Sequence, residues 1–162
     1  TVERATARIA ELGATFLTVH GFPQTMKAAV LGKAGRDLNI LAVTVMTSYD
    51  DSDLKDAGYS CSVQDLVRKR AVQAVEAGVD GLILSPWEVA EIRALVGPTL
   101  ELITPGIRPA GSQVGDQKRI MTPREAIKAG ADRLVIGRPI TAANDPKLEA
   151  MKILAEIHEA AG

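Results

Sequence analysis

Residues 102–109 read LITPGIRP and residues 134–139 read LVIGRP, and these two stretches carry the strongest structural signal in the chain. In each, a short run of aliphatic residues passes directly into glycine and then arginine. This pattern is typical of a buried parallel strand whose carboxyl end presents a cation, and a guanidinium beside a glycine suits a phosphate group. We therefore expect a phosphate-bearing ligand at these two strand ends.

Aliphatic, β-branched runs alternate with amphipathic stretches along the chain, as they do in βα units around a parallel sheet. No linker or low-complexity segment interrupts this alternation, so residues 1–162 are expected to form a single domain. The expected strands are 16–19, 40–46, 81–84, 101–104 and 134–136, and the expected helices are 2–12, 24–31, 63–77, 86–96, 123–129 and 146–161.

Two α/β architectures fit five βα units: an open doubly wound sheet and a part of an eight-stranded barrel. Polar residues follow three different strands, at Thr47, Arg108 and Arg138, and this favours the barrel. A complete barrel takes about 250 residues, and the sequence opens on a helical pattern. We expect an incomplete TIM (β/α)8 barrel, about strands 4 to 8 with their helices.

The composition excludes several classes of partner. Hydrophobic residues make up 46% of the 162 residues and aromatic residues only 3%, so the core must be aliphatic. With 19 basic against 20 acidic residues the net charge is -1, which argues against nucleic-acid and membrane partners. The single cysteine, Cys61, allows no internal disulfide and suits a reducing cytoplasm.

Three residues that follow the last two strands have the chemistry to bind phosphate. Gly137 lets the backbone approach an oxyanion, and Arg138 offers it a planar fork of donors. Loops after the last two strands of many barrels bind phosphate. Arg108 follows the expected strand at 101–104, which directly precedes the last one. The alternative is a glycine turn followed by a surface arginine that pairs with a helix carboxylate.

Gln117 lies nine residues after Arg108, in a segment at 106–121 that has no periodic pattern. Such segments in compact domains are usually functional or disordered. Three or four charge-assisted contacts contribute roughly 1.5 to 3 kcal/mol each, whereas ordering about seven residues costs roughly 1 to 2 kcal/mol apiece. These terms nearly cancel, so we predict a lid that is mobile when empty and ordered by ligand. The alternative for Gln117 is a solvated loop residue.

Thr47 follows the second expected strand, where its hydroxyl could bond a polar ligand; the alternative is a cap for the following helix.

The acidic residues at 50–53 lack the later glycine and glutamate of a calcium loop, so we expect them in the first turn of a helix. His20 and His158 have no second ligand at a suitable spacing. We expect no metal site.

Five segments in order resemble the bacterial orotidine 5'-phosphate decarboxylase family. They are VTVMTS at 43–48, TPGIRP at 104–109, GDQKR at 115–119, MTP at 121–123 and VIGRPIT at 135–141. Each is weak alone, but the set is specific and spans essentially the whole chain. The resemblance implies a cofactor-free homodimeric enzyme of pyrimidine synthesis that converts orotidine 5'-phosphate to UMP and carbon dioxide.

The resemblance also implies roles for single residues. Those matching Arg108, Gln117, Gly137 and Arg138 bind the phosphate, and the one matching Thr47 contacts the pyrimidine. Thr1 matches a threonine that reaches across the dimer interface into the partner's site. The family's catalytic lysine and aspartates precede that threonine, so they are expected upstream of Thr1, and a fragment without them is expected to be inactive and unstable.

The sequence leaves two other functions open. One is a sugar-phosphate lyase of the same wider barrel group, against which Thr47 and the motif at 115–119 argue. The other is a non-catalytic phosphate-binding module. The sequence preceding Thr1 distinguishes these readings, because only the decarboxylase requires the lysine and aspartate motif there.

Overall fold

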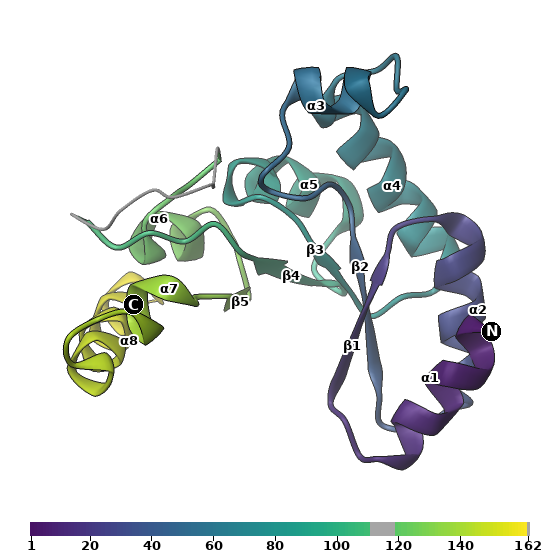
Figure 1. Ribbon diagram of the computed structural model, residues 1–162, viewed down its shortest axis with the longest axis horizontal. Coiled ribbons are helices and arrows are strands. Elements are labelled where there is room, and N and C mark those ends of the chain that lie inside the picture. The colour runs from purple at the N-terminus through teal and green to yellow at the C-terminus, as the bar shows by residue number, and fades with distance from the viewer. Residues whose placement is uncertain (111–118, 162) are drawn as a thin grey trace.

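A five-stranded parallel sheet forms the centre of the computed structural model, which describes residues 1–110 and 119–161 (Figure 1). Every neighbouring pair is parallel, and each strand pairs with the next along the chain, in the order β1-β2-β3-β4-β5. The described sheet therefore lacks the reversal of strand order that defines a doubly wound fold. The strands are β1 (Phe16–His20), β2 (Asn39–Val43), β3 (Gly81–Ile83), β4 (Glu101–Thr104) and β5 (Arg133–Leu134).

The helices form two groups beside this sheet. Consecutive members of the first group pack on one another, α1 on α2, α2 on α4 and α4 on α5, while α6 and α7 pack on α8 at the β5 end (Figure 1). The elements are α1 (Val2–Glu11), α2 (Pro23–Lys33), α3 (Asp51–Asp56), α4 (Val63–Ala77), the 3-10 helix η1 (Pro86–Glu88), α5 (Val89–Val96), α6 (Pro123–Lys128), α7 (Arg138–Thr141) and α8 (Pro146–Ala161). None of the described helices is long and apolar enough to cross a membrane.

The core between the sheet and the first helix group is aliphatic, as the composition predicts. Its largest fully buried side chains include Met26 from α2, Ile40 from β2, Leu82 from β3, Ile92 from α5 and Leu102 from β4. Ile40, Leu82 and Leu102 belong to one buried cluster with side chains of α2, α4 and α5. This packing holds the carboxyl ends of the strands, and the residues that follow them, in fixed relative positions.

Three expected strands were too long, the one expected at 81–84 by a single residue. The strand expected at 40–46 ends at Val43, because the chain leaves the ladder after the Thr44 amide donates to the Ile83 carbonyl at 3.0 Å. The strand expected at 134–136 ends at Leu134, and the short helix α7 at 138–141 was not anticipated. Apolar β-branched residues continue past both ends, so composition alone could not locate the exits.

The acidic cluster begins a helix, as predicted. The Asp50 carboxylate accepts from the amides of Ser52 and Asp53 at 3.0 and 3.1 Å, and Asp53 accepts from the Asp50 amide at 2.8 Å. This reciprocal capping box starts α3. Among the described residues no group of three or more histidine, cysteine or acidic side chains has the arrangement of a metal site.

Candidate functional site

A pocket of about 270 Å³ opens beyond the carboxyl ends of β2, β3 and β4. Ligands of parallel α/β proteins bind at this edge of the sheet, where the strands end and the loops begin. Its lining combines aliphatic side chains with the hydroxyl groups of Thr47 and Ser48, and Pro105 contributes from the end of β4. The lining residues are Val43, Val45, Met46, Thr47, Ser48, Ile83 and Pro105.

Thr47 lies in this pocket, and 7% of its surface is exposed. It does not cap the following helix, because the cap of α3 is Asp50. The structure thus removes the alternative of a helix cap that the sequence left open. A nearly buried hydroxyl in the wall of a pocket is suited to orient a polar ligand.

Arg108 is held just beyond β4 by a second chain segment. Its amide donates to the Met121 carbonyl at 2.9 Å, and the Met121 amide donates to the Gly106 carbonyl at 3.3 Å. These bonds form a parallel bridge between Ile107 and Met121. Arg108 as a whole residue is only 8% exposed, and its Nη1 donates to the Ile107 carbonyl at 2.8 Å. The segment without periodicity is therefore tied to the sheet at its far end.

Gly137 and Arg138 follow β5 and form the start of α7, where both are exposed. The Gly137 carbonyl accepts from the amides of Ile140 and Thr141 at 2.9 and 3.0 Å. A Cβ added at Gly137 would meet no atom within 4 Å, so packing inside the protein does not require glycine here. The space beside the Gly137 backbone is therefore open, and a ligand group has room to approach it from outside the protein.

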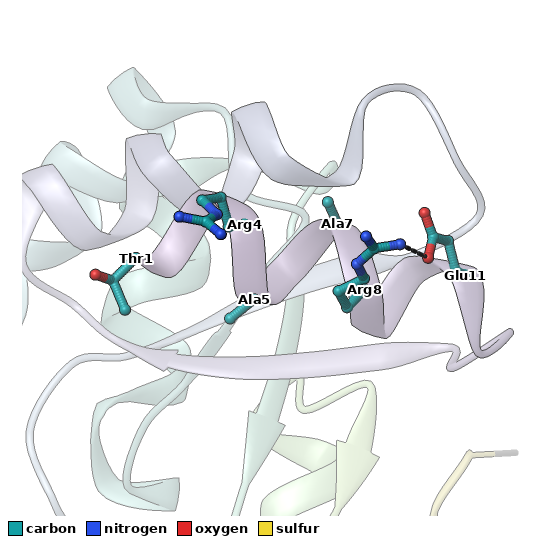
Figure 2. A pocket seen from close by; sticks show the side chains of 6 residues that line it. All are labelled: Thr1, Arg4, Ala5, Ala7, Arg8 and Glu11. Carbon is teal, nitrogen blue, oxygen red and sulfur yellow. Dashed lines mark hydrogen bonds and ion pairs between the residues drawn. The ribbon is translucent and has the colours of Figure 1, made fainter.

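Thr1 lies away from this pocket, at the start of α1. It is exposed, and its side chain makes no capping hydrogen bond within the described residues. Figure 2 shows it at one end of a shallow surface pocket of about 540 Å³ on α1. Arg4, Ala5, Ala7, Arg8 and Glu11 line the rest, and Arg8 Nη1 donates to Glu11 at 2.8 Å. The two pockets share no residue. The role predicted for Thr1 lies in a partner's site and stays a prediction. Gln117 and the other residues at 111–118, which belong to the predicted lid, lie outside the described residues.

One buried ion pair near the strand ends was missed by the sequence analysis. Arg119 and Glu88 have side-chain exposures of 8% and 9%, and Arg119 Nη1 pairs with Glu88 Oε1. Burial lowers the pKa of the Arg119 guanidinium below its ordinary value, an effect that the charge of Asp51 opposes. Glu88 lies three residues after Ser85 and completes a capping box with it. That spacing could have located Glu88 in a helix start, but nothing local indicates its pairing with Arg119.

Residues 1–153 match the sequence profile of the family described as "Orotidine 5'-phosphate decarboxylase / HUMPS family". The chain belongs to this family. The chain is 64% identical over 160 residues to a protein named orotidine 5'-phosphate decarboxylase from Bradyrhizobium sp. (strain BTAi1), covering 99% of this chain and 66% of the relative. It is 61% identical over 160 residues to the protein of that name from Rhodopseudomonas palustris (strain BisB5), covering 99% and 68%. The chain thus spans about two thirds of the length of such curated relatives.

Solved structures of the orotidine 5'-phosphate decarboxylase / HUMPS family have the same fold. The Lactobacillus acidophilus orotidine 5'-phosphate decarboxylase superposes with a TM-score of 0.80 at 35% identity, covering 96% of this chain and 69% of that one. The Pyrococcus horikoshii protein of the same name superposes with a TM-score of 0.70 at 24% identity, covering 98% and 70%, and supports the fold alone. The resemblance stated from the five sequence segments is confirmed, whereas the roles of Thr1, Thr47, Arg108, Gln117, Gly137 and Arg138 stay predictions.

Proposed function

We propose that this protein decarboxylates orotidine 5'-phosphate to UMP in de novo pyrimidine synthesis. The observation that carries the proposal is that Thr47, Arg108 and the Gly137-Arg138 pair follow the carboxyl ends of β2, β4 and β5, which lie in one parallel sheet. This arrangement occurs in a chain that is 64% identical to a protein named orotidine 5'-phosphate decarboxylase. No cofactor is needed in this proposal, because the protein itself supplies the charges.

In the proposal the phosphate and the base bind at opposite ends of one site. Arg108, Gln117, Gly137 and Arg138 bind the phosphate, and Thr47 in its pocket orients the pyrimidine. Each charge-assisted bond to the phosphate contributes about 1.5 to 3 kcal/mol, so two guanidiniums supply about 3 to 6 kcal/mol. Binding energy from this non-reacting group can be used to hold the pyrimidine where charge develops at the transition state.

The wider architecture belongs to the same proposal. Five parallel strands in sequential order, with helices that pack on one another in chain order, fit about strands 4 to 8 of a (β/α)8 barrel in a single domain at 1–162. The lysine and aspartates that perform the chemistry in the family are placed before Thr1. The enzyme is a cytoplasmic homodimer in this proposal, with Thr1 completing the partner's site.

The test uses the protein as its gene encodes it, assayed for release of carbon dioxide from carboxyl-labelled orotidine 5'-phosphate. We expect turnover, competitive inhibition by UMP, and a KM raised by about 10- to 100-fold in Arg108→Ala, from the loss of about 1.5 to 3 kcal/mol. Turnover of a sugar phosphate in its place would support the sugar-phosphate lyase. Binding of UMP without any turnover would support the non-catalytic module.

A second experiment assigns the roles of the parts. Residues 1–162 are purified alone and then mixed with a separately expressed segment that carries the family's lysine and aspartate motif. We expect no turnover from the first sample and recovered turnover from the mixture. Turnover by the chain alone would show that its own residues perform the chemistry and would refute the assignment.

A further inference from the structure

A single buried ion pair connects three parts of the chain at the carboxyl edge of the sheet. Arg119 Nη1 pairs with Glu88 Oε1, and Arg119 Nη2 donates to the Met46 carbonyl at 3.0 Å. The other carboxylate oxygen of Glu88 accepts from the Ser85 amide at 3.0 Å, directly beyond β3. The guanidinium therefore joins the end of β2 to the end of β3.

On its other side, Arg119 is continuous with the segment that fixes the end of β4. The Ile120 carbonyl accepts from Trp87 Nε1 at 2.8 Å, and Met121 forms the parallel bridge that holds Arg108. Trp87 and Glu88 are neighbours in η1, so two adjacent side chains of η1 hold residues 119 and 120. Any shift of this segment moves the backbone partner of Arg108.

The end of β2 depends on such contacts because its ladder stops early. Thr44 makes the last backbone bond to β3, and Met46 and Thr47 lie beyond it. The Met46 carbonyl also accepts from the Tyr49 amide at 2.9 Å, so it receives one local bond and one long-range bond from Arg119. Thr47 is the next residue and lines the pocket.

From this geometry we propose that Arg119 and Glu88 are positioning residues that set the location of Thr47 relative to Arg108. The inference rests on the proposed function, in which Thr47 and Arg108 contact the two ends of one nucleotide. A buried ion pair contributes little net stability compared with apolar side chains of similar volume. Its use here points to the directed bonds that its two side chains make, from Arg119 Nη2 to the Met46 carbonyl and from the Ser85 amide to Glu88. Neither residue touches the ligand in this proposal.

The test compares ligands that span the site with ligands that occupy one end of it. In the protein as its gene encodes it, Arg119→Lys keeps the charge but replaces the two separate nitrogens that face Glu88 and Met46 by one ammonium on a shorter reach. Glu88→Gln removes the charge and one of the two carboxylate oxygens that face Arg119 and Ser85. Inhibition constants are measured for UMP, for uridine and for inorganic phosphate. A displacement approaching 1 Å weakens a contact that depends on relative position by up to about 100-fold.

We expect both variants to raise the inhibition constant of UMP by about 10-fold or more. The inhibition constants of uridine and of inorganic phosphate should change by less than about twofold, because each of these ligands occupies only one end of the site. The KM for orotidine 5'-phosphate should rise in parallel with the inhibition constant of UMP. The matched control is Arg68→Gln, which breaks an ion pair with Glu91 on the exposed side of α4 and α5. This control should bind all three ligands as the parent does.

A double variant, Arg119→Met with Glu88→Met, covers the case in which a single change prevents folding. It removes both charges together, so no buried charge is left without a partner, and we expect it to fold and to lose UMP affinity selectively. Equal losses for UMP and inorganic phosphate, or UMP binding equal to that of Arg68→Gln, would overturn the inference alone. A parent protein that does not bind UMP would overturn the proposed function and the inference with it.

Discussion

Replacing Gly32 with alanine should destabilise the protein, although alanine is the better helix former. Gly32 lies in α2 where α1 crosses closely: an added Cβ would come within 2.3 Å of the Glu3 carbonyl oxygen and 2.8 Å of Thr6 Cβ. Figure 1 shows the two helices side by side. The nearest atom belongs to backbone, so a side-chain rotation cannot relieve the contact and α1 must move as a unit.

The sign follows from two magnitudes. Alanine in place of glycine gains at most about 1 kcal/mol of helix propensity, whereas overpacking a close contact costs about 1 to 3 kcal/mol. Because the contact is with backbone, we take the upper half of that range and expect a net loss of about 1 to 2 kcal/mol. For a protein of about this size the melting temperature then falls by about 2 to 8 °C.

The assay is thermal and urea unfolding of the protein as its gene encodes it, followed by circular dichroism. The control is Ala28→Gly in the same helix, which measures what glycine costs α2 and should destabilise by about 1 kcal/mol at most. If Gly32→Ala instead raises the melting temperature, α1 does not approach α2 as closely as described. A decrease in both variants supports the close crossing of the helices.

Three further predictions concern other parts of the molecule. Asp80→Ala should lower the free energy of unfolding by about 2 kcal/mol in urea titrations. The Asp80 carboxylate accepts from the Ile40 amide at 2.7 Å, and a hydrogen bond to a charged acceptor contributes about 1.5 to 3 kcal/mol. Asp80→Asn keeps an acceptor and should lose less stability, so an equal loss in the two variants would contradict this account. Hydrogen bonds from the hydroxyl and the amide of Thr122 hold the pKa of Glu125 below its ordinary 4.5, so this carboxylate stabilises the fold above pH 4.5 and the contribution is lost as the pH falls through the lower folded value. An NMR titration should find the pKa of Glu125 below 4.5 and closer to 4.5 in Thr122→Ala, whereas identical titration curves would refute the assignment. Arg108→Lys should bind inorganic phosphate more weakly than the parent, because an ammonium lacks the fork of donors, and equal inhibition constants would argue against contact with the phosphate.

Local patterns predicted most of the fold. The helices at 63–77 and 146–161 begin and end where apolar spacing and flanking proline and glycine place them. The sequence also located the end of the strand before Arg108, at Thr104, since an aliphatic run that passes into glycine and arginine is a signal contained in eight neighbouring residues, but it placed the end of the strand before Arg138 two residues too late. Other strand ends, such as the one at Val43, were predicted at the wrong residue, because a strand ends where the neighbouring strand no longer provides a hydrogen-bond partner.

Part of the candidate site could not be predicted in this way. Thr47 follows a strand in the sequence, but only the folded chain shows that it lines a pocket together with Pro105 from β4. The choice between a helix cap and a pocket residue was likewise settled by Asp50, which occupies the cap. A local sequence pattern cannot distinguish two roles of a residue when the roles differ only in contacts with distant parts of the chain.

By itself, the sequence determined the βα alternation, the aliphatic core and the residues that follow each strand, because these depend on periodicities of two and 3.6 residues and on turn chemistry within a few positions. Tertiary structure alone decided which of those residues meet. The bond from Arg119 to Met46 joins positions 73 residues apart, and its existence depends on the order and register of β2, β3 and β4. Strand pairing is set by packing over the whole sheet, so the contacts that position this site arise only when the sheet has formed.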